Sequence, residues 1–82
     1  MKIHTSALFR SQKNKLGKVQ LEQLNTVVEK IKNQPELGTA KTGDLQGVYT
    51  YIYNDGLGKV LLGYRLYNKN MKIKLITLSR IS

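Results

Sequence analysis

The sequence has no cysteine, one proline and one histidine among its 82 residues. Without cysteine, neither a disulfide nor a thiolate-bound metal can stabilise the fold. One histidine and five acidic residues are too few for us to expect a zinc site or a Ser-His-Asp triad. We interpret the histidine, His4, as a surface residue, and we predict no metal and no small-molecule cofactor.

Long hydrophobic runs are also missing. No segment approaches the roughly 20 apolar residues that a membrane-spanning helix needs. Residues 1–16 contain no apolar run as long as the core of a signal peptide. We therefore expect a cytoplasmic protein without a membrane segment, in which residues 1–82 form a single domain.

Acidic residues are few compared with basic ones. The 14 Lys and Arg outnumber the 5 Asp and Glu, and the formal net charge is +9 at pH 7. A field of this sign attracts polyanions and speeds their capture. Since a charge of about 2 to 8 already keeps a small domain soluble, we favour a polyanionic partner over lysines that serve solubility alone. Nucleic acid, an acidic protein and an anionic membrane surface all fit this description.

The first half of the chain has the spacing of amphipathic helices. A weak apolar stripe predicts a short helix over about residues 6–16, with a short strand around Ile3 before it. Residues 18–33 carry apolar side chains at every third or fourth position, which predicts a second helix. Gly17 separates the two and Pro35 ends the second, so we expect an antiparallel helical hairpin.

In the second half the period changes to two, as in β-strands. We expect strands over residues 48–53, 59–67 and 71–78, with turns at 54–56 and 68–70. Two helices followed by hairpin-linked strands predict an α+β domain. In this fold an N-terminal helical hairpin packs on a small three- to four-stranded antiparallel sheet.

Alternation along the two later strands predicts one basic face. In each strand, one set of alternate residues is mostly apolar and the other includes cations. Antiparallel sheets usually cover one face and leave the other partly solvated. The open face is therefore expected to carry Arg65, Tyr67, Lys72 and Lys74.

Three of the five tyrosines alternate along the stretch GDLQGVYTYIY, residues 43–53. Both alternate sets of this strand are β-formers, so the pattern alone does not decide which set is covered. We place Val48 and Ile52 on the helices. The ladder of Tyr49, Tyr51 and Tyr53 then lies on the basic face, where tyrosine rings could stack on unpaired bases.

A basic surface with tyrosines could bind RNA or cleave it. Cleavage without a metal needs cations that stabilise the charged transition state, and groups that position the 2′-hydroxyl and the leaving oxygen. Arg65, between Tyr64 and Tyr67, could supply the first requirement. The alternative is that Arg65 makes a cross-strand pair and that the tyrosines pack in the core.

Residues 35–53 read PELGTAKTGDLQGVYTYIY and resemble the RelE/ParE superfamily of toxins from bacterial type II toxin–antitoxin modules. The superfamily pattern there is PELG-x-x-K-x-GDL-x-G-V-x-x-Y, preceded by an asparagine where this chain has Gln34. The segment LLGY, residues 61–64, matches the next strand of these toxins. The resemblance covers nearly the whole chain and implies the helical hairpin and small antiparallel sheet expected above.

The resemblance implies one of two activities. RelE-like relatives cleave mRNA in the ribosomal A site, whereas ParE-like relatives poison DNA gyrase and cleave nothing. We favour a ribosome-dependent mRNA interferase, which is a metal-independent endoribonuclease, or a degenerate relative of one. The alternatives are a gyrase inhibitor, or an inactive module that binds an antitoxin or nucleic acid. Both kinds of toxin are bound by a cognate antitoxin, so the expected partners are an acidic antitoxin protein and either mRNA on the ribosome or gyrase.

The resemblance also implies site residues. Arg65 matches the arginine that RelE-type ribonucleases use on the strand GYRLY, and is the candidate catalytic residue. Thr50 and Ile52 stand where such enzymes have lysines. Related chains continue past the last strand with a segment that often supplies a catalytic tyrosine or histidine, whereas this sequence stops at Ser82; the expectation is that activity is lost or that the end has diverged. Candidates for nucleic-acid binding are Lys41, Tyr51, Tyr67, Lys72 and Lys74.

Overall fold

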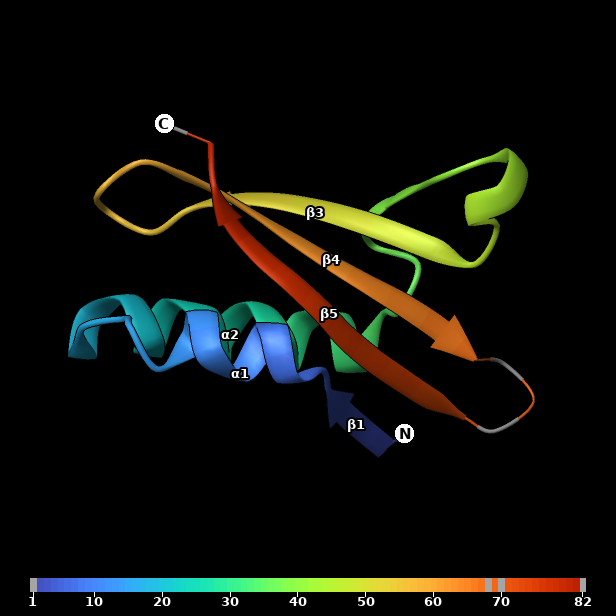
Figure 1. Ribbon diagram of the computed structural model, residues 1–82, viewed down its shortest axis with the longest axis horizontal. Helices are drawn as coiled ribbons and strands as arrows, with labels where there is room; N and C mark the ends of the chain where they lie inside the picture. Colours follow the sequence, from blue (N-terminus) through green and yellow to red (C-terminus); the bar gives the residue numbers. More distant parts are fainter. Residues whose placement is uncertain (1, 68, 70, 82) are drawn as a thin grey trace.

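Strands and helices follow one another along the chain in the computed structural model, which describes residues 2–67, 69 and 71–81. Figure 1 shows the two helices lying below a twisted sheet. Within the described residues the elements are β1 (Lys2–Thr5), α1 (Ala7–Lys13), α2 (Lys18–Asn33), β2 (Thr39–Ala40), the short 3-10 helix η1 (Gly43–Leu45), β3 (Val48–Asn54), β4 (Lys59–Tyr67) and β5 (Lys72–Arg80).

Local interactions determine where α1 begins and where α2 ends. Ser6 caps α1, since its side chain accepts a hydrogen bond from the Phe9 amide at 2.9 Å. The helix ends at Lys13, three residues before the predicted end. Helix α2 has the predicted bounds, and Gln34 at φ −142° is already extended, as expected before Pro35. The helices run antiparallel (Figure 1), which confirms the predicted hairpin.

The described strands form one sheet in the order β1-β5-β4-β3-β2. All neighbouring pairs are antiparallel except β1 and β5, which are parallel. The expected sheet of three or four antiparallel strands is therefore wrong in both number and direction. Strand β1 pairs with a strand at the far end of the chain, and the sequence near β1 does not reveal that partner. Strand β2 has only two residues, which is too short for an alternating pattern.

The turn between β3 and β4 confirms the hairpin predicted at 54–56. The Asn54 side chain accepts a hydrogen bond from the Gly56 amide at 2.8 Å. The Asp55 amide donates to the Gly58 carbonyl at 3.1 Å. The second predicted turn, at 68–70, includes Asn68 and Asn70, which lie outside the described residues.

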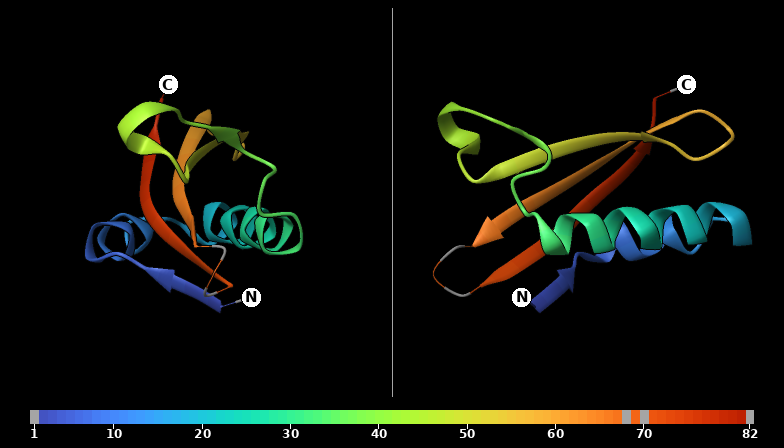
Figure 2. Two further views of the ribbon diagram at one scale, coloured as in Figure 1. Left: turned by 90° about the vertical axis from the view of Figure 1, so that its right-hand side faces the viewer. Right: turned by 180° about the vertical axis from the view of Figure 1, so that it is seen from behind.

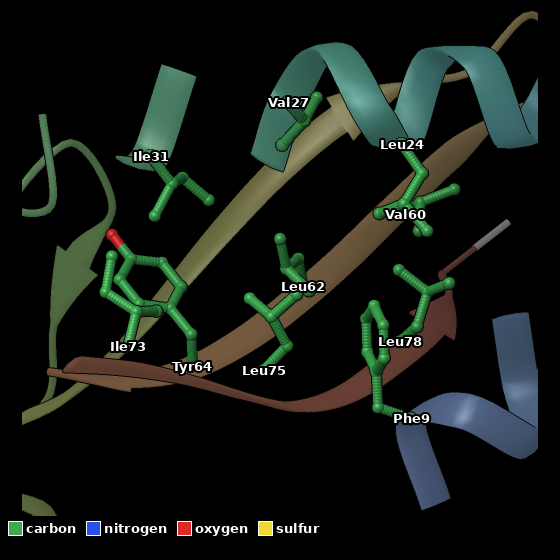
Figure 3. Close-up of a cluster of buried hydrophobic side chains, with 10 residues drawn as sticks. All are labelled: Phe9, Leu24, Val27, Ile31, Val60, Leu62, Tyr64, Ile73, Leu75 and Leu78. Carbon is green, nitrogen blue, oxygen red and sulfur yellow. The ribbon is translucent and has the colours of Figure 1, made fainter. Parts of the chain in front are cut away.

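The hydrophobic core lies between the sheet and α2, and Phe9 of α1 closes one end of it (Figure 3). Strands β4 and β5 supply six of its side chains. In Figure 3 these face Leu24, Val27 and Ile31 of α2. The full set is Phe9, Leu24, Val27, Ile31, Val60, Leu62, Tyr64, Ile73, Leu75 and Leu78.

The tyrosine ladder lies on this covered face, so its assignment to the basic face is wrong. Across the β3–β4 pair, Tyr49 is opposite Tyr64, and the next two tyrosines are opposite Leu62 and Val60. The ring of Tyr49 stacks on Tyr64 with 5.5 Å between centroids. The alternate residue Ile52 is 52% exposed, so its predicted place on the helices is wrong as well. Tyrosine suits the rim of a core because its ring buries apolar area while its hydroxyl stays wet.

A β-bulge in β5 changes which residues face the core. Gly63 is opposite Thr77 while Tyr64 is opposite Leu75, so Ile76 is an extra residue. Beyond the bulge Leu78 returns to the core, three residues after Leu75, so the regular alternation expected for this strand is wrong there.

Helix α1 supplies hydrogen bonds to the backbone of this bulge. The Ser6 hydroxyl donates to the Ile76 carbonyl at 2.6 Å, and the Leu78 amide donates to the Gln12 side chain at 2.7 Å. Helix α1 therefore lies along the edge of β5, beyond the end of β1, while α2 covers the face of the sheet (Figure 2). The prediction that both helices pack on one face is wrong for α1.

Candidate nucleic-acid interface

Four predicted site residues share the face of the sheet that points away from α2. Arg65 lies opposite Lys74, and Tyr67 lies opposite Lys72 in the β4–β5 pair. The residues that alternate with them along each strand belong to the core, so these four side chains project to the other side. The structure thus brings three cations and a tyrosine together at one end of the β4–β5 hairpin.

Strand β1 adds two residues that the sequence analysis did not include. Lys2 lies beside Lys72, and His4 lies beside Lys74, in parallel pairing. Both are exposed, whereas Ile3 between them packs against the core. The alternation of polar and apolar residues in KIHT could have indicated that Lys2 and His4 share a face. It could not indicate which strand they lie beside, because the partner strand β5 is at the opposite end of the chain.

Lys41 ends a row of residues that crosses the sheet. Its amide donates to the Val48 carbonyl at 2.8 Å, which extends the β2–β3 register by one pair, and Val48 lies opposite Arg65. The row is therefore His4, Lys74, Arg65, Val48 and Lys41. Its four inter-strand steps span about 19 Å at the usual strand spacing.

Arg65 at the centre of the row is half-buried, and its backbone surroundings orient its guanidinium. Its Nη1 donates to the Gln46 carbonyl at 3.2 Å. Gly47 has φ +91°, a left-handed value that favours glycine, and a Cβ there would lie 3.5 Å from Nη1. Of the five guanidinium N–H donors, one is used in the bond to Gln46. Arg65 forms no ion pair with a described carboxylate, so its other donors can meet a phosphate.

Tyr67 and Lys72 contact each other on this face. The Lys72 ammonium lies 4.7 Å from the centre of the Tyr67 ring, within the range of a cation–π interaction. The contact places a cation against one side of the Tyr67 ring.

The PELG motif has a structural role that supports this face. The Tyr64 hydroxyl donates to the Pro35 carbonyl at 2.7 Å and accepts from the Gly38 amide at 3.0 Å. A Cβ at Gly38 would lie 2.7 Å from the Thr50 carbonyl oxygen, so only glycine allows the loop to come this close. Burial raises the pKa of the Tyr64 hydroxyl, which keeps it protonated and able to donate. The loop that leads to Lys41 is thus anchored in the core.

Tyr51 is the predicted site residue that the structure separates from the rest. It lies on the covered face, opposite Leu62, and its ring stacks on Tyr53 with 6.4 Å between centroids. It therefore does not share a face with the other predicted site residues.

The other end of the β4–β5 hairpin also carries an arginine, but a carboxylate neutralises it. Arg80 and Asp55 form a two-fold contact, with Nη2–Oδ2 at 2.6 Å and Nη1–Oδ1 at 3.1 Å. Asp55 is only 2% exposed. The hydrogen bond from Arg80, with a further one from the Leu57 amide, holds the pKa of the Asp55 carboxyl below its usual range although burial opposes this.

A hollow of about 330 Å³ opens beside this ion pair, between the end of α1 and the β3–β4 turn. Tyr53 lines it, and burial together with the negative charge of Asp55 raises the pKa of Tyr53 to about 12. Its full lining is Gln12, Lys15, Leu16, Tyr53, Asp55, Val60, Leu78 and Arg80.

Two further findings limit the chemistry of the described residues. Within 2–67, 69 and 71–81, no three His, Cys, Asp or Glu side chains lie close enough together to hold a metal ion. Neither of the described helices is long and apolar enough to cross a membrane.

Comparison with known proteins identifies relatives of this chain. The family model for ParE-like toxins of type II bacterial toxin–antitoxin systems matches residues 3–81. No curated protein sequence matches.

Solved structures match nearly the full length. A chain of the intact E. coli RelBE toxin–antitoxin complex has a TM-score of 0.82 at 15% identity, over 99% of this chain and 96% of that one. The isolated E. coli RelE toxin gives 0.81 at 16% identity, over 99% and 84%. The YoeB/ParE toxin from Agrobacterium tumefaciens gives 0.77 at 15% identity, over 100% of both chains. At these identities the likeness shows a common fold.

Proposed function

We propose that this chain, which belongs to the ParE-like toxins of type II bacterial toxin–antitoxin systems, is a metal-independent endoribonuclease that cleaves mRNA on the ribosome. The observation that carries the proposal is that the row across the open sheet face contains Lys74, Arg65 and Lys41, and that no described carboxylate pairs with Arg65 at its centre. A surface of this kind suits a phosphate backbone.

The proposed reaction is the attack of a ribose 2′-oxygen on the neighbouring phosphorus. Negative charge on the phosphate oxygens increases in the transition state, and Arg65 would stabilise it with guanidinium donors held in place by the Gln46 carbonyl. Lys74 and Lys41, on either side of Arg65 in the row, would hold the flanking phosphates. Tyr67 would stack on a base beside the cleaved bond.

The same face suits an acidic antitoxin. Structures of related toxins include complexes with antitoxins, among them RelBE2 from Mycobacterium tuberculosis, which matches with a TM-score of 0.72 at 18% identity. An acidic segment laid over the cations of the row would exclude RNA from them, so binding of antitoxin and of mRNA would compete.

Gyrase inhibition is the second candidate. It is favoured by the part of the open face that lies away from the row, where Ile52 is 52% exposed and lies opposite Leu61. An apolar patch of this kind suits a protein partner better than a phosphate backbone.

The test is cell-free translation in which the 5′ ends of the mRNA are mapped. The wild type should cut within codons, and Arg65→Gln should reduce the rate by about 10²- to 10³-fold, because it removes a charge that stabilises the transition state. Arg80→Gln at the far end of the hairpin is the matched control and should still cut. Intact message with the wild type, together with loss of supercoiling in a gyrase assay, would establish the second candidate instead.

A further inference from the structure

The only histidine lies on the cationic face. Ile3 packs against the core, so the next residue, His4, projects from β1 to the open side and is exposed. It lies beside Lys74, which lies opposite Arg65. His4 and Arg65 therefore stand on either side of Lys74, on strands whose axes are about 10 Å apart at the usual spacing.

This separation suits two side chains that act on one phosphodiester. A phosphate bound above Lys74 would lie between the guanidinium of Arg65 and the imidazole of His4. Arg65 would contact the phosphate oxygens, and the imidazole would meet the ribose on the β1 side.

The proposed cleavage needs a group that removes the proton of the 2′-hydroxyl. Lysine, arginine and tyrosine side chains ordinarily keep their protons at pH 7 and do not accept another. Imidazole can accept a proton in this range. The charged neighbours of His4 on the face are Lys2 of its own strand and Lys72 and Lys74 of β5, all of them basic side chains.

Four of the five acidic side chains lie elsewhere. Glu22 and Glu29 belong to α2, Glu36 follows that helix, and Asp55 is bound by Arg80. Asp44 in η1 is the competing base, since it is exposed and stands two residues from Gln46, which binds Arg65.

We infer that His4 is the general base of the cleavage, an inference that rests on the proposed ribonuclease function. The imidazole takes the proton of the 2′-hydroxyl as the 2′-oxygen forms a bond to phosphorus. The bond from phosphorus to the 5′-oxygen breaks, and water protonates that oxygen. The products are a 2′,3′-cyclic phosphate and a 5′-hydroxyl, and the imidazolium returns its proton to solvent.

The experiment measures single-turnover cleavage of mRNA on programmed ribosomes between about pH 5 and 8, the range in which histidine titrates. The wild-type rate should rise with pH to a plateau. His4→Gln should be slower by about 10²- to 10⁴-fold, the usual contribution of a general base, and its rate should no longer rise through this range. Its co-sedimentation with ribosomes should match that of the wild type.

Chemical rescue with imidazole distinguishes a chemical role of His4 from a structural one. Free imidazole added to His4→Ala should restore cleavage in proportion to its concentration, and it should not raise the rate of Arg65→Gln. The matched control Asp44→Asn should keep the wild-type pH profile.

Three outcomes would overturn the inference. His4→Gln that cleaves at the wild-type rate with the same profile would reject His4 alone and leave the ribonuclease proposal standing. Loss of the pH dependence in Asp44→Asn would give the role to Asp44. A wild type that cleaves nothing would reject the proposed function and the role of His4 with it.

Discussion

The two ends of the β4–β5 hairpin carry one arginine each, and the two are used differently. Arg80 binds both oxygens of Asp55, a carboxylate that is almost wholly buried. Arg65 is held by a single carbonyl and faces Lys74, another cation. Paired charges at one end join the β3–β4 turn to the end of β5, whereas unpaired charges at the other end repel one another.

This difference separates the arginine that is paired with a carboxylate from the cations that carry the proposed function. Like charges on neighbouring strands cost stability, and a net charge far from zero adds self-repulsion. A polyanion laid over the row would remove that repulsion. The proposed function therefore rests on the Arg65 end, while the ion pair of Arg80 contributes to the fold.

The largest effects are expected when the same substitution, arginine to glutamine, is made at each end of the hairpin. Arg65→Gln should lower cleavage by about 10²- to 10³-fold and leave stability within about 0.5 kcal/mol of the wild type, as for most surface changes. Arg80→Gln should do the reverse, because it leaves the buried Asp55 without its cation. Urea denaturation and the cleavage assay, run on both variants, measure the two effects. Loss of activity in Arg80→Gln at full stability would contradict the assignment.

The next largest effect is expected from two tyrosine variants, one at each end of the hairpin, whose stabilities are compared. Tyr64→Phe removes the hydroxyl that binds Pro35 and Gly38 and should destabilise the protein by about 1–3 kcal/mol, since two partly buried backbone groups lose their partner. Cleavage should fall too, because the loop leading to Lys41 loses its anchor. Tyr53→Phe, at the far end, should change stability by less than about 0.5 kcal/mol. Equal destabilisation by the two variants in urea denaturation would show that the loop is held by other contacts.

The salt dependence of RNA binding tests whether the cations of the row contact phosphates. Lys74→Gln should weaken RNA binding across all sequences and reduce the slope of log affinity against log salt by about 1, as expected when one phosphate contact is lost. Lys59→Gln, on the same strand pair but at the Arg80 end, is the control and should leave the slope unchanged. Filter binding at several salt concentrations measures both slopes. A slope that falls equally in the two variants would mean that RNA is bound by net charge alone.

The smallest effect concerns acid stability. The pKa of Asp55 is lowered in the folded state, so the unfolded chain binds its proton first as the pH falls. The contribution of the ion pair is complete above the ordinary aspartate pKa of about 3.9. It is lost as the pH drops through the lower folded value. Asp55→Asn should flatten this part of the stability curve, as thermal unfolding between about pH 2 and 5 would measure. An unchanged curve would contradict the assigned shift.

Some of the fold could be read from local pattern. Helix α2 and strand β4 have the predicted bounds, because a strong 3.6-residue period ends before Pro35 and a turn signal at Asn54 precedes the strand. The weaker pattern of α1 gave an end three residues too late. Strand β5 begins and ends one to two residues later than predicted, since alternation does not mark strand ends.

Part of the candidate site could be predicted from the sequence. Alternation in β4 and β5 predicted that Arg65 and Lys74 share a face, because the bulge at Ile76 comes only after Lys74. The position of Tyr51 could not be predicted, since both faces of β3 consist of β-forming residues and only packing against β4 decides between them. His4 was interpreted as a surface residue, and its neighbours were unknown.

Sequence alone determined the positive charge, the periods of the helices and strands and the motif that marks the family, because each depends on residue type and on near neighbours along the chain. Tertiary structure decided which face of β3 is covered, where α1 lies, and that a histidine at one end of the chain stands two strands from Arg65. These arrangements come from pairing between distant segments. Its free energy depends on burial and hydrogen bonds that exist only after the chain has folded.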